Sequence, residues 1–252
     1  MMRGGGLQRL PSRFFAGSLE RGGLMGREEA VRQAVGKADG YELLSCLFAY
    51  PDERVANGLV DGLIAEDARA CLLDAGVAED EVHAVGDALG AWRGTSAADV
   101  LSAMRIAYSH LYLAPGGHTP VQPYESAFLH VERGLSGIPS LFRTPVTMDV
   151  ERCMREAGVV AKNARKEPCD SVFEEFEFLS YLYAKLADAL SDDDAEAATT
   201  AVAGWTERLR AFEDEHALAW LPAFMRRTQE LAGDGPYAAF AALGLAAMGV
   251  RS

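Results

Sequence analysis

Apolar side chains recur at helical spacing along almost all of the chain from residue 28 onward. In the first such segment they fall three or four positions apart, at Val31, Ala34, Val35, Ala38, Tyr41, Leu44, Leu47 and Phe48, which is typical of one buried helix face. Pro51 ends this helix, because the proline ring removes a backbone donor and clashes with the preceding turn. No segment shows the alternation of a strand, so the pattern predicts an all-α fold.

Two later helices are the most clearly defined. Ser96 and Asp99 form a capping box ahead of an apolar stripe made by Leu101, Met104, Tyr108, Leu111 and Tyr112. The second helix is predicted to open at Pro168 or Asp170, and its stripe consists of Val172, Phe176, Leu179, Tyr183, Leu186 and Leu190. We therefore expect Phe176 to be buried. Glu174, Glu175 and Glu177 lie mostly off the stripe, and they are interpreted as a solvated face.

Proline, glycine and charged segments separate the helices. Between residues 115 and 123 the chain holds three prolines and two glycines, which cannot continue a helix. A second loop contains Gly137 and Pro139, and Thr147 is predicted to cap a helix that ends at Gly158. Several short helices are predicted at 53–92. A basic linker, residues 162–166, precedes the helix with the Phe176 stripe, and an acidic linker, residues 191–195, precedes helices predicted at 196–215, 222–232 and 236–248. Residues 27–252 are thus predicted to form a single helical domain of roughly ten helices, with a hinge at 114–123.

Residues 1–26 differ from the rest of the chain. They contain Arg3, Arg9, Arg13 and Arg21, seven glycines and no acid before Glu20. No apolar central region of a secretory signal is present. The segment is interpreted as a disordered leader or as the product of a start codon assigned too early, with Met25 the true start; an Arg-rich transit peptide is the alternative.

The net charge and the hydropathy of the chain limit the kinds of partner that it can bind. The formal net charge is −13 and the sequence pI is about 4.8, which opposes nucleic-acid binding and favours basic segments; high solubility is the other explanation. No apolar run approaches the roughly 20 residues that span a bilayer, so no stable membrane insertion is expected. Cys46, Cys71, Cys153 and Cys169 form no CxxC pair, and free thiols in a reducing cytoplasm account for them.

Motifs of common enzymes are missing. The sequence has no GxxxxGK[ST] phosphate loop, no GxSxG elbow and no HExxH. A di-iron site in a helical bundle needs two ExxH pairs, and the one present is Glu213 with His216. The sequence therefore predicts no catalytic residue, no metal and no cofactor, with a carboxylate-bridged di-iron protein as the alternative.

Two loops place carboxylates beside aromatic or apolar residues at the start of a helix. One holds Tyr124, Glu125 and Ser126, and the other holds Glu167, Pro168 and Asp170. Such carboxylates suit bidentate pairing with arginine, or they cap helices and fix turns.

Three blocks carry a family resemblance. They are Tyr108-Ser109-His110-Leu111-Tyr112 with the following Pro120-Val121-Gln122-Pro123-Tyr124-Glu125-Ser126; Glu167-Pro168-Cys169-Asp170 with Phe176-Glu177-Phe178-Leu179; and Phe212, His216, Leu218, Trp220, Pro222 and Phe224. The chain resembles the TorD/DmsD family of maturation chaperones for molybdenum-containing redox enzymes, with NarJ-type chaperones as more distant relatives. The resemblance spans roughly residues 28–248. One departure is Ser171, since the family's second motif usually ends in Asp-His.

The resemblance implies an all-helical cytoplasmic protein without catalytic activity. It implies that the chain binds the twin-arginine signal peptide, the apo form, or both, of a molybdopterin oxidoreductase catalytic subunit, and that it holds back export until the cofactor is inserted. The implied peptide-binding residues are Tyr124, Glu125, Ser126, Glu167, Pro168, Asp170, Ser171 and Trp220. Family members are monomers or domain-swapped dimers. A general interaction scaffold is the remaining alternative.

Overall fold

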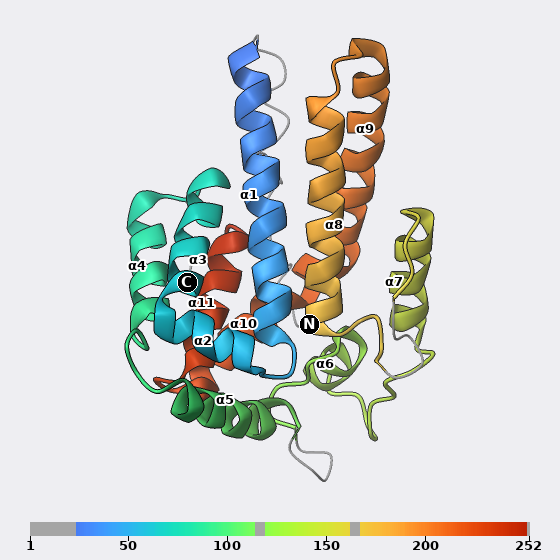
Figure 1. Ribbon diagram of the computed structural model, residues 1–252. Coiled ribbons are helices and arrows are strands. Elements are labelled where there is room, and N and C mark those ends of the chain that lie inside the picture. Colours follow the sequence, from blue (N-terminus) through green and yellow to red (C-terminus); the bar gives the residue numbers. More distant parts are fainter. Residues whose placement is uncertain (1–23, 114–118, 162–166, 251–252) are drawn as a thin grey trace, which may run out of the picture.

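The structure, a computed structural model, describes residues 24–113, 119–161 and 167–250 (Figure 1). Its elements within these ranges are helices: α1 Leu24–Phe48, α2 Glu53–Asp61, α3 Leu63–Asp74, α4 Glu79–Gly90, α5 Ala97–Tyr112, α6 Glu125–Glu132, α7 Pro145–Glu156, α8 Val172–Ser191, α9 Ala195–Phe212, the π-helical turn η1 Glu213–Ala217, α10 Leu218–Ala232 and α11 Pro236–Ala247. No strand occurs in the described ranges, so the predicted all-α fold is confirmed.

Helices α1 and α8 form the long axis of the molecule (Figure 1). They run antiparallel, since Arg27 at the start of α1 donates to the carbonyl of Leu190 near the end of α8, whereas Phe48 and Phe176 meet at the opposite ends of the two helices, with ring centroids 6.0 Å apart. Phe176 is fully buried, as its place in the stripe predicts. The apolar stripes of the two helices therefore pack against each other.

An aromatic core joins this pair to the C-terminal helices. The ring of Phe48 contacts Phe224 of α10 and both Tyr237 and Phe240 of α11, at centroid distances between 5.7 and 6.4 Å. Tyr112 at the end of α5 stacks on Phe224 at 5.6 Å. Segments far apart in sequence thus share one core, which joins α1, α5, α10 and α11.

Several predicted helix ends are wrong by a few residues. Thr144, not Thr147, is the N-cap of α7, because Pro145 occupies the first helical position and the Thr144 hydroxyl accepts the Thr147 N–H at 3.0 Å. Helix α8 begins after Ser171 instead of at Pro168 or Asp170. Pro222 lies inside α10, because η1 leads directly from α9 into α10.

Two predicted segments fall largely outside the described residues. Of the predicted leader at 1–26, residues 24–26 already belong to α1, so the boundary was placed too late, and residues 1–23 lie outside. Of the predicted hinge, residues 114–118 lie outside. None of the described helices combines the length and the apolar character that a membrane span requires.

Candidate functional site

The two motif-bearing loops lie side by side. The Glu125 N–H donates to the Asp170 carbonyl at 2.8 Å, and the Val172 N–H donates to the Pro123 carbonyl at 2.9 Å. Tyr124 and Ser171 form an isolated antiparallel bridge between them. We call residues 123–126 and 168–172 the paired loops; they place the first turns of α6 and α8 next to each other.

Asp170 caps α6 from the neighbouring loop. Its Oδ2 accepts the Ser126 N–H at 3.0 Å, which satisfies one of the free donors at the N-terminus of α6. The side chain is fully buried, and burial raises the pKa of Asp170 while hydrogen bonding to Ser126 opposes the rise. Of the two roles that the sequence offers for this carboxylate, pairing with arginine or capping a helix, the structure shows the capping contact for Asp170.

Glu125 is buried as well, and it holds His216. The Glu125 carboxylate bonds Nδ1 of the imidazole at 2.8 Å, and Asp149 of α7 bonds Nε2 at 3.2 Å. Burial alone would lower the pKa of His216, but its interactions with Cys153 and Glu125 raise that pKa to about 11. At neutral pH His216 is thus an imidazolium between two carboxylates.

Glu175 joins the same interior, so the interpretation of Glu174, Glu175 and Glu177 as a solvated face is wrong for Glu175, and also for Glu174, which is buried; Glu177 is exposed. It is fully buried, and the Trp220 indole N–H donates to its Oε2 at 2.9 Å. Its Oε1 has no hydrogen-bond partner among the described residues. Burial, and then the charge of Glu125, raise the pKa of Glu175 well above its usual value, so a neutral carboxylic acid fits this position. We call Glu125, Asp170, Glu175, His216 and Trp220 the inner cluster.

A second group, three acids and a tyrosine, lies around the paired loops. Tyr124 and Glu167 are half-buried and adjacent, Glu174 is buried with 9% of its surface exposed, and Glu177 is exposed. Burial, followed by the charges of Glu177 and Glu167, raises the pKa of Glu174 to about 7. We call Tyr124, Glu167, Glu174 and Glu177 the outer rim.

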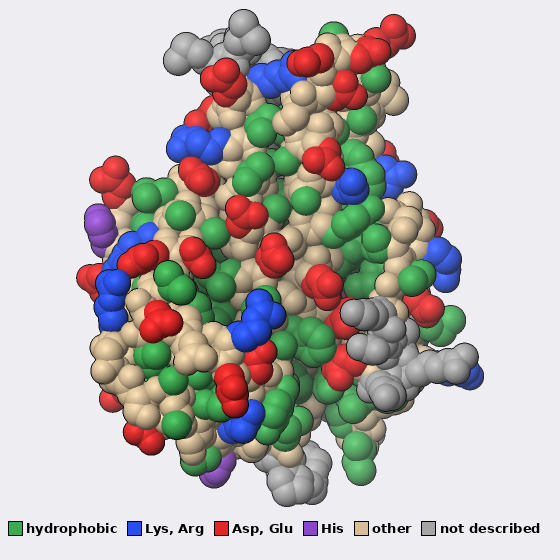
Figure 2. Space-filling view, in the orientation of Figure 1, with side chains coloured by type: hydrophobic (Ala, Val, Ile, Leu, Met, Phe, Trp, Pro, Cys, Tyr) green, Lys and Arg blue, Asp and Glu red, His purple; other side chains and the backbone are tan. Residues whose placement is uncertain are grey.

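The outer rim has no basic counterpart in the described part of the chain. Its carboxylates form no ion pair with any Lys or Arg described. Figure 2 shows further acidic side chains over the face made by α1 and α8, with hydrophobic side chains between them. This face offers carboxylates and apolar area together to an incoming cation.

The predicted site residues therefore separate into two sets. Tyr124 and Glu167 keep accessible side chains on the outer rim, whereas Glu125, Ser126, Pro168, Asp170, Ser171 and Trp220 are buried. Ser171 stands where the family usually has histidine, and its hydroxyl has no hydrogen-bond partner among the described residues. The imidazole of His216 nevertheless contacts the paired loops, because it bonds Glu125.

Sequence reasoning missed Asp149, Glu175 and His216 as members of the site. A signal for His216 existed, because it lies four residues after Phe212 and four before Trp220, and both are buried. The ExxH pair does not converge on one point: Glu213 accepts the Tyr183 hydroxyl at 2.8 Å, whereas His216 faces Glu125 and Asp149. The described residues thus give the di-iron alternative no support.

Fold and site together define an all-α protein whose motifs build paired loops with an acidic rim, an arrangement suited to binding. The family model of the nitrate reductase delta subunit matches residues 74–226, more than half of the chain. The chain belongs to this family, which consists of TorD-type chaperones that mature molybdoenzymes. No curated protein matches the chain, and no solved structure matches it.

Proposed function

We propose that the chain is a cytoplasmic chaperone that binds the twin-arginine signal peptide of a molybdopterin-dependent oxidoreductase. It binds the catalytic subunit in its apo form, assists cofactor insertion and holds back export until insertion is complete. Membership of the family supports a molybdoenzyme as the partner. A cytoplasmic location follows from this role, because the leader must be bound before export.

The outer rim carries the proposal. Burial, and then the charges of Glu177 and Glu167, raise the pKa of Glu174 to about 7, and a guanidinium placed among these carboxylates would favour their charged forms. Arginine pairs with carboxylates in a planar, bidentate geometry and stacks on aromatic rings. Glu167, Glu174 and the ring of Tyr124 offer both kinds of contact to the two arginines of a leader.

The six buried residues of the predicted site have a supporting role in this proposal. Asp170 and Ser126 join the two loops, and Glu125 ties α6 to His216. Trp220 of α10 holds Glu175 in the first turn of α8. A site held by such rigid contacts loses less entropy on binding than one carried on a free loop.

Calorimetric titration of a twin-arginine peptide tests the proposal. We expect saturable binding that weakens as salt rises and that a peptide with both arginines replaced by glutamine does not show. The double variant Glu167→Gln/Glu174→Gln should weaken binding by about two- to thirtyfold, since a pair near the surface contributes roughly 0.2–1 kcal/mol and the variant removes two.

Glu28→Gln is the matched control. Glu28 is an exposed acid near the start of α1, at the end of the α1–α8 pair remote from Glu174. Its replacement removes the same charge and should leave affinity unchanged. Equal affinity for the arginine and glutamine peptides at all salt concentrations would contradict the proposed leader binding.

A further inference from the structure

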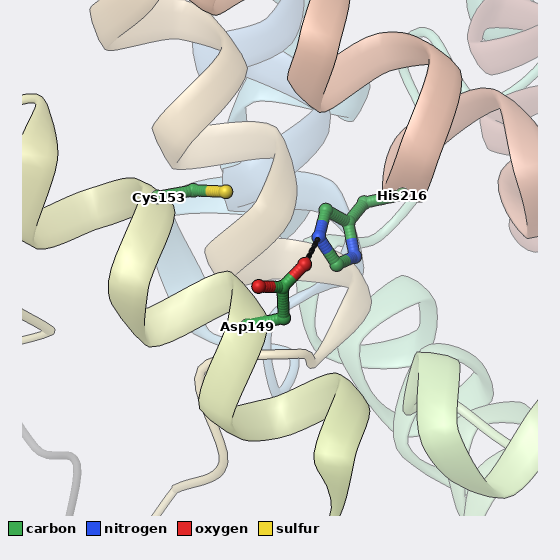
Figure 3. A group of neighbouring side chains, drawn as sticks. All are labelled: Asp149, Cys153 and His216. Atoms are coloured by element: carbon green, nitrogen blue, oxygen red, sulfur yellow. Dashed lines mark hydrogen bonds and ion pairs between the residues drawn. The ribbon is translucent and has the colours of Figure 1, made fainter.

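Three side chains of different chemistry converge between α7 and η1 (Figure 3). Asp149 and Cys153 are one turn apart on α7, and His216 faces them from η1. A carboxylate oxygen, the thiol sulfur and an imidazole nitrogen of these residues all lie within 4.8 Å of one another. In Figure 3 the thiol of Cys153 and the carboxylate of Asp149 both point toward the imidazole.

His216 is held with one nitrogen facing this group. Glu125, which is 2% exposed, bonds Nδ1 at 2.8 Å, and this bond directs Nε2 toward Asp149. Histidines that ligate metals usually donate their other ring N–H to a carboxylate, which fixes the tautomer and the orientation of the ring. His216 also lies in a π-helical turn, a geometry frequent at functional sites.

Asp149 is oriented in a similar way. Its Oδ1 accepts Arg152 Nε at 2.7 Å, while Oδ2 faces His216. The 3.2 Å between Oδ2 and Nε2 is close to the about 3.3 Å that separates two ligands of a tetrahedral ion with bonds near 2.0 Å. The two atoms can therefore share an ion with little movement.

We propose that Asp149, Cys153 and His216 bind a zinc ion, with Glu125 as the residue that positions His216. A set of thiolate, imidazole and carboxylate suits Zn²⁺, whereas Mg²⁺ and Ca²⁺ prefer oxygen ligands throughout. Three protein ligands leave the fourth tetrahedral position for a water molecule or for a donor from a bound partner. The Cys153 thiol gives up its proton to become the ligand, and the ion takes the place of the hydrogen between Nε2 and Asp149.

The ion would link α7 to the rest of the fold. In Figure 1, α7 lies at the periphery, beside α8. Zinc would join α7 to η1, directly behind the Glu125 that belongs to the paired loops. This site is independent of leader binding, because it uses no residue of the outer rim.

Cobalt(II) substitution in the full chain, freed of metal by a chelator and carrying no histidine tag, tests the site. We expect one cobalt per chain, with the ligand-field absorption of a tetrahedral ion and a thiolate-to-cobalt charge-transfer band, and displacement by equimolar zinc. Cys153→Ser should abolish the charge-transfer band, and Asp149→Asn and Glu125→Gln should each weaken zinc binding by roughly 10- to 100-fold.

Cys46→Ser is the control for the thiol, since Cys46 is exposed and remote in sequence from the three ligands. It should keep the full spectrum. Zinc should also raise the melting temperature of the wild type and of Cys46→Ser, but not that of Cys153→Ser. Wild-type protein without a charge-transfer band, or the same band in folded Cys153→Ser, would overturn the site and leave Glu125, His216 and Asp149 as a hydrogen-bonded triad alone.

Discussion

The inner cluster and the outer rim are built from the same two motifs, but their environments differ. In the Tyr124-Glu125-Ser126 segment, the side chain of Tyr124 goes to the rim while that of Glu125 goes to the interior. Glu125 has a buried cation as its partner, whereas Glu174 has other carboxylates as neighbours. Removal of one partner from the inner cluster should therefore cost stability, whereas the rim keeps repulsion between carboxylates that a basic ligand can relieve.

The largest expected effect comes from removing Glu125. Glu125→Ala leaves the buried imidazolium of His216 without its closest carboxylate, and loss of one partner of a buried pair typically costs about 3–5 kcal/mol. Urea denaturation with a chelator present measures this loss in the free energy of unfolding. Glu167→Ala is the comparison from the rim and should change stability by less than about 1 kcal/mol. Equal losses for the two variants would remove the distinction between cluster and rim.

The fold could be predicted from the sequence because apolar residues recur at a regular helical spacing. The stripe around Phe176 repeats every three or four residues, and each of its members is buried as expected. Helix ends were less certain, because Thr144 and Thr147 are equally good capping residues until Pro145 fixes the first turn. The motifs indicated a TorD-type chaperone family, and the match to the nitrate reductase delta subunit model confirms the family at that level but no finer subfamily.

The site could be predicted only in part, because burial of acids is decided by tertiary packing. Glu174 and Glu175 are both buried, and a local signal existed for Glu175, which lies three residues after Val172 and four before Leu179, on the buried face. Its hydrogen-bond partner Trp220 lies 45 positions further along the chain, and no local sequence pattern indicates that the two residues are in contact. The resemblance assigned residues of both loops to one site, but it did not indicate that Glu125 and Asp170 are buried.

At the outer rim we expect an effect of intermediate size and of opposite sign: loss of the Glu174 charge should increase the free energy of unfolding. The pKa of Glu174 is about 7 in the folded chain, against an ordinary value of 4.5, so the folded state binds the proton more tightly. Below about pH 4.5 the carboxyl is protonated in both states and contributes nothing. Stability then falls as pH rises to about 7, and above that pH the whole penalty is present.

Glu174→Gln removes this penalty. We expect the variant to be more stable than the wild type by about 1–2 kcal/mol at pH 8, less than the full shift implies because the side chain can turn toward water. The difference in unfolding free energy between the two proteins should vanish near pH 4. In the calorimetric titration, the more stable variant should also be the weaker binder. A variant destabilised at pH 8 would show that the carboxylate has a favourable partner.

The smallest effect on stability is expected for Asp170→Asn. This variant shows whether Asp170 acts as a helix cap or contacts the peptide. Asp170→Asn keeps an oxygen that can accept the Ser126 N–H. It loses the negative charge, which the helix dipole favours at the start of α6. We expect a loss of about 1 kcal/mol in the free energy of unfolding, comparable with loss of a helix cap, and unchanged affinity for the twin-arginine peptide. Affinity should stay unchanged because the side chain is fully buried, and an arginine cannot reach it while the paired loops stay closed.

Melting curves and peptide titrations of the wild type and of Asp170→Asn, at low and high salt, test this prediction. If affinity instead fell and lost its dependence on salt while stability stayed the same, Asp170 would pair with the peptide, and the paired loops would have to open when the leader binds.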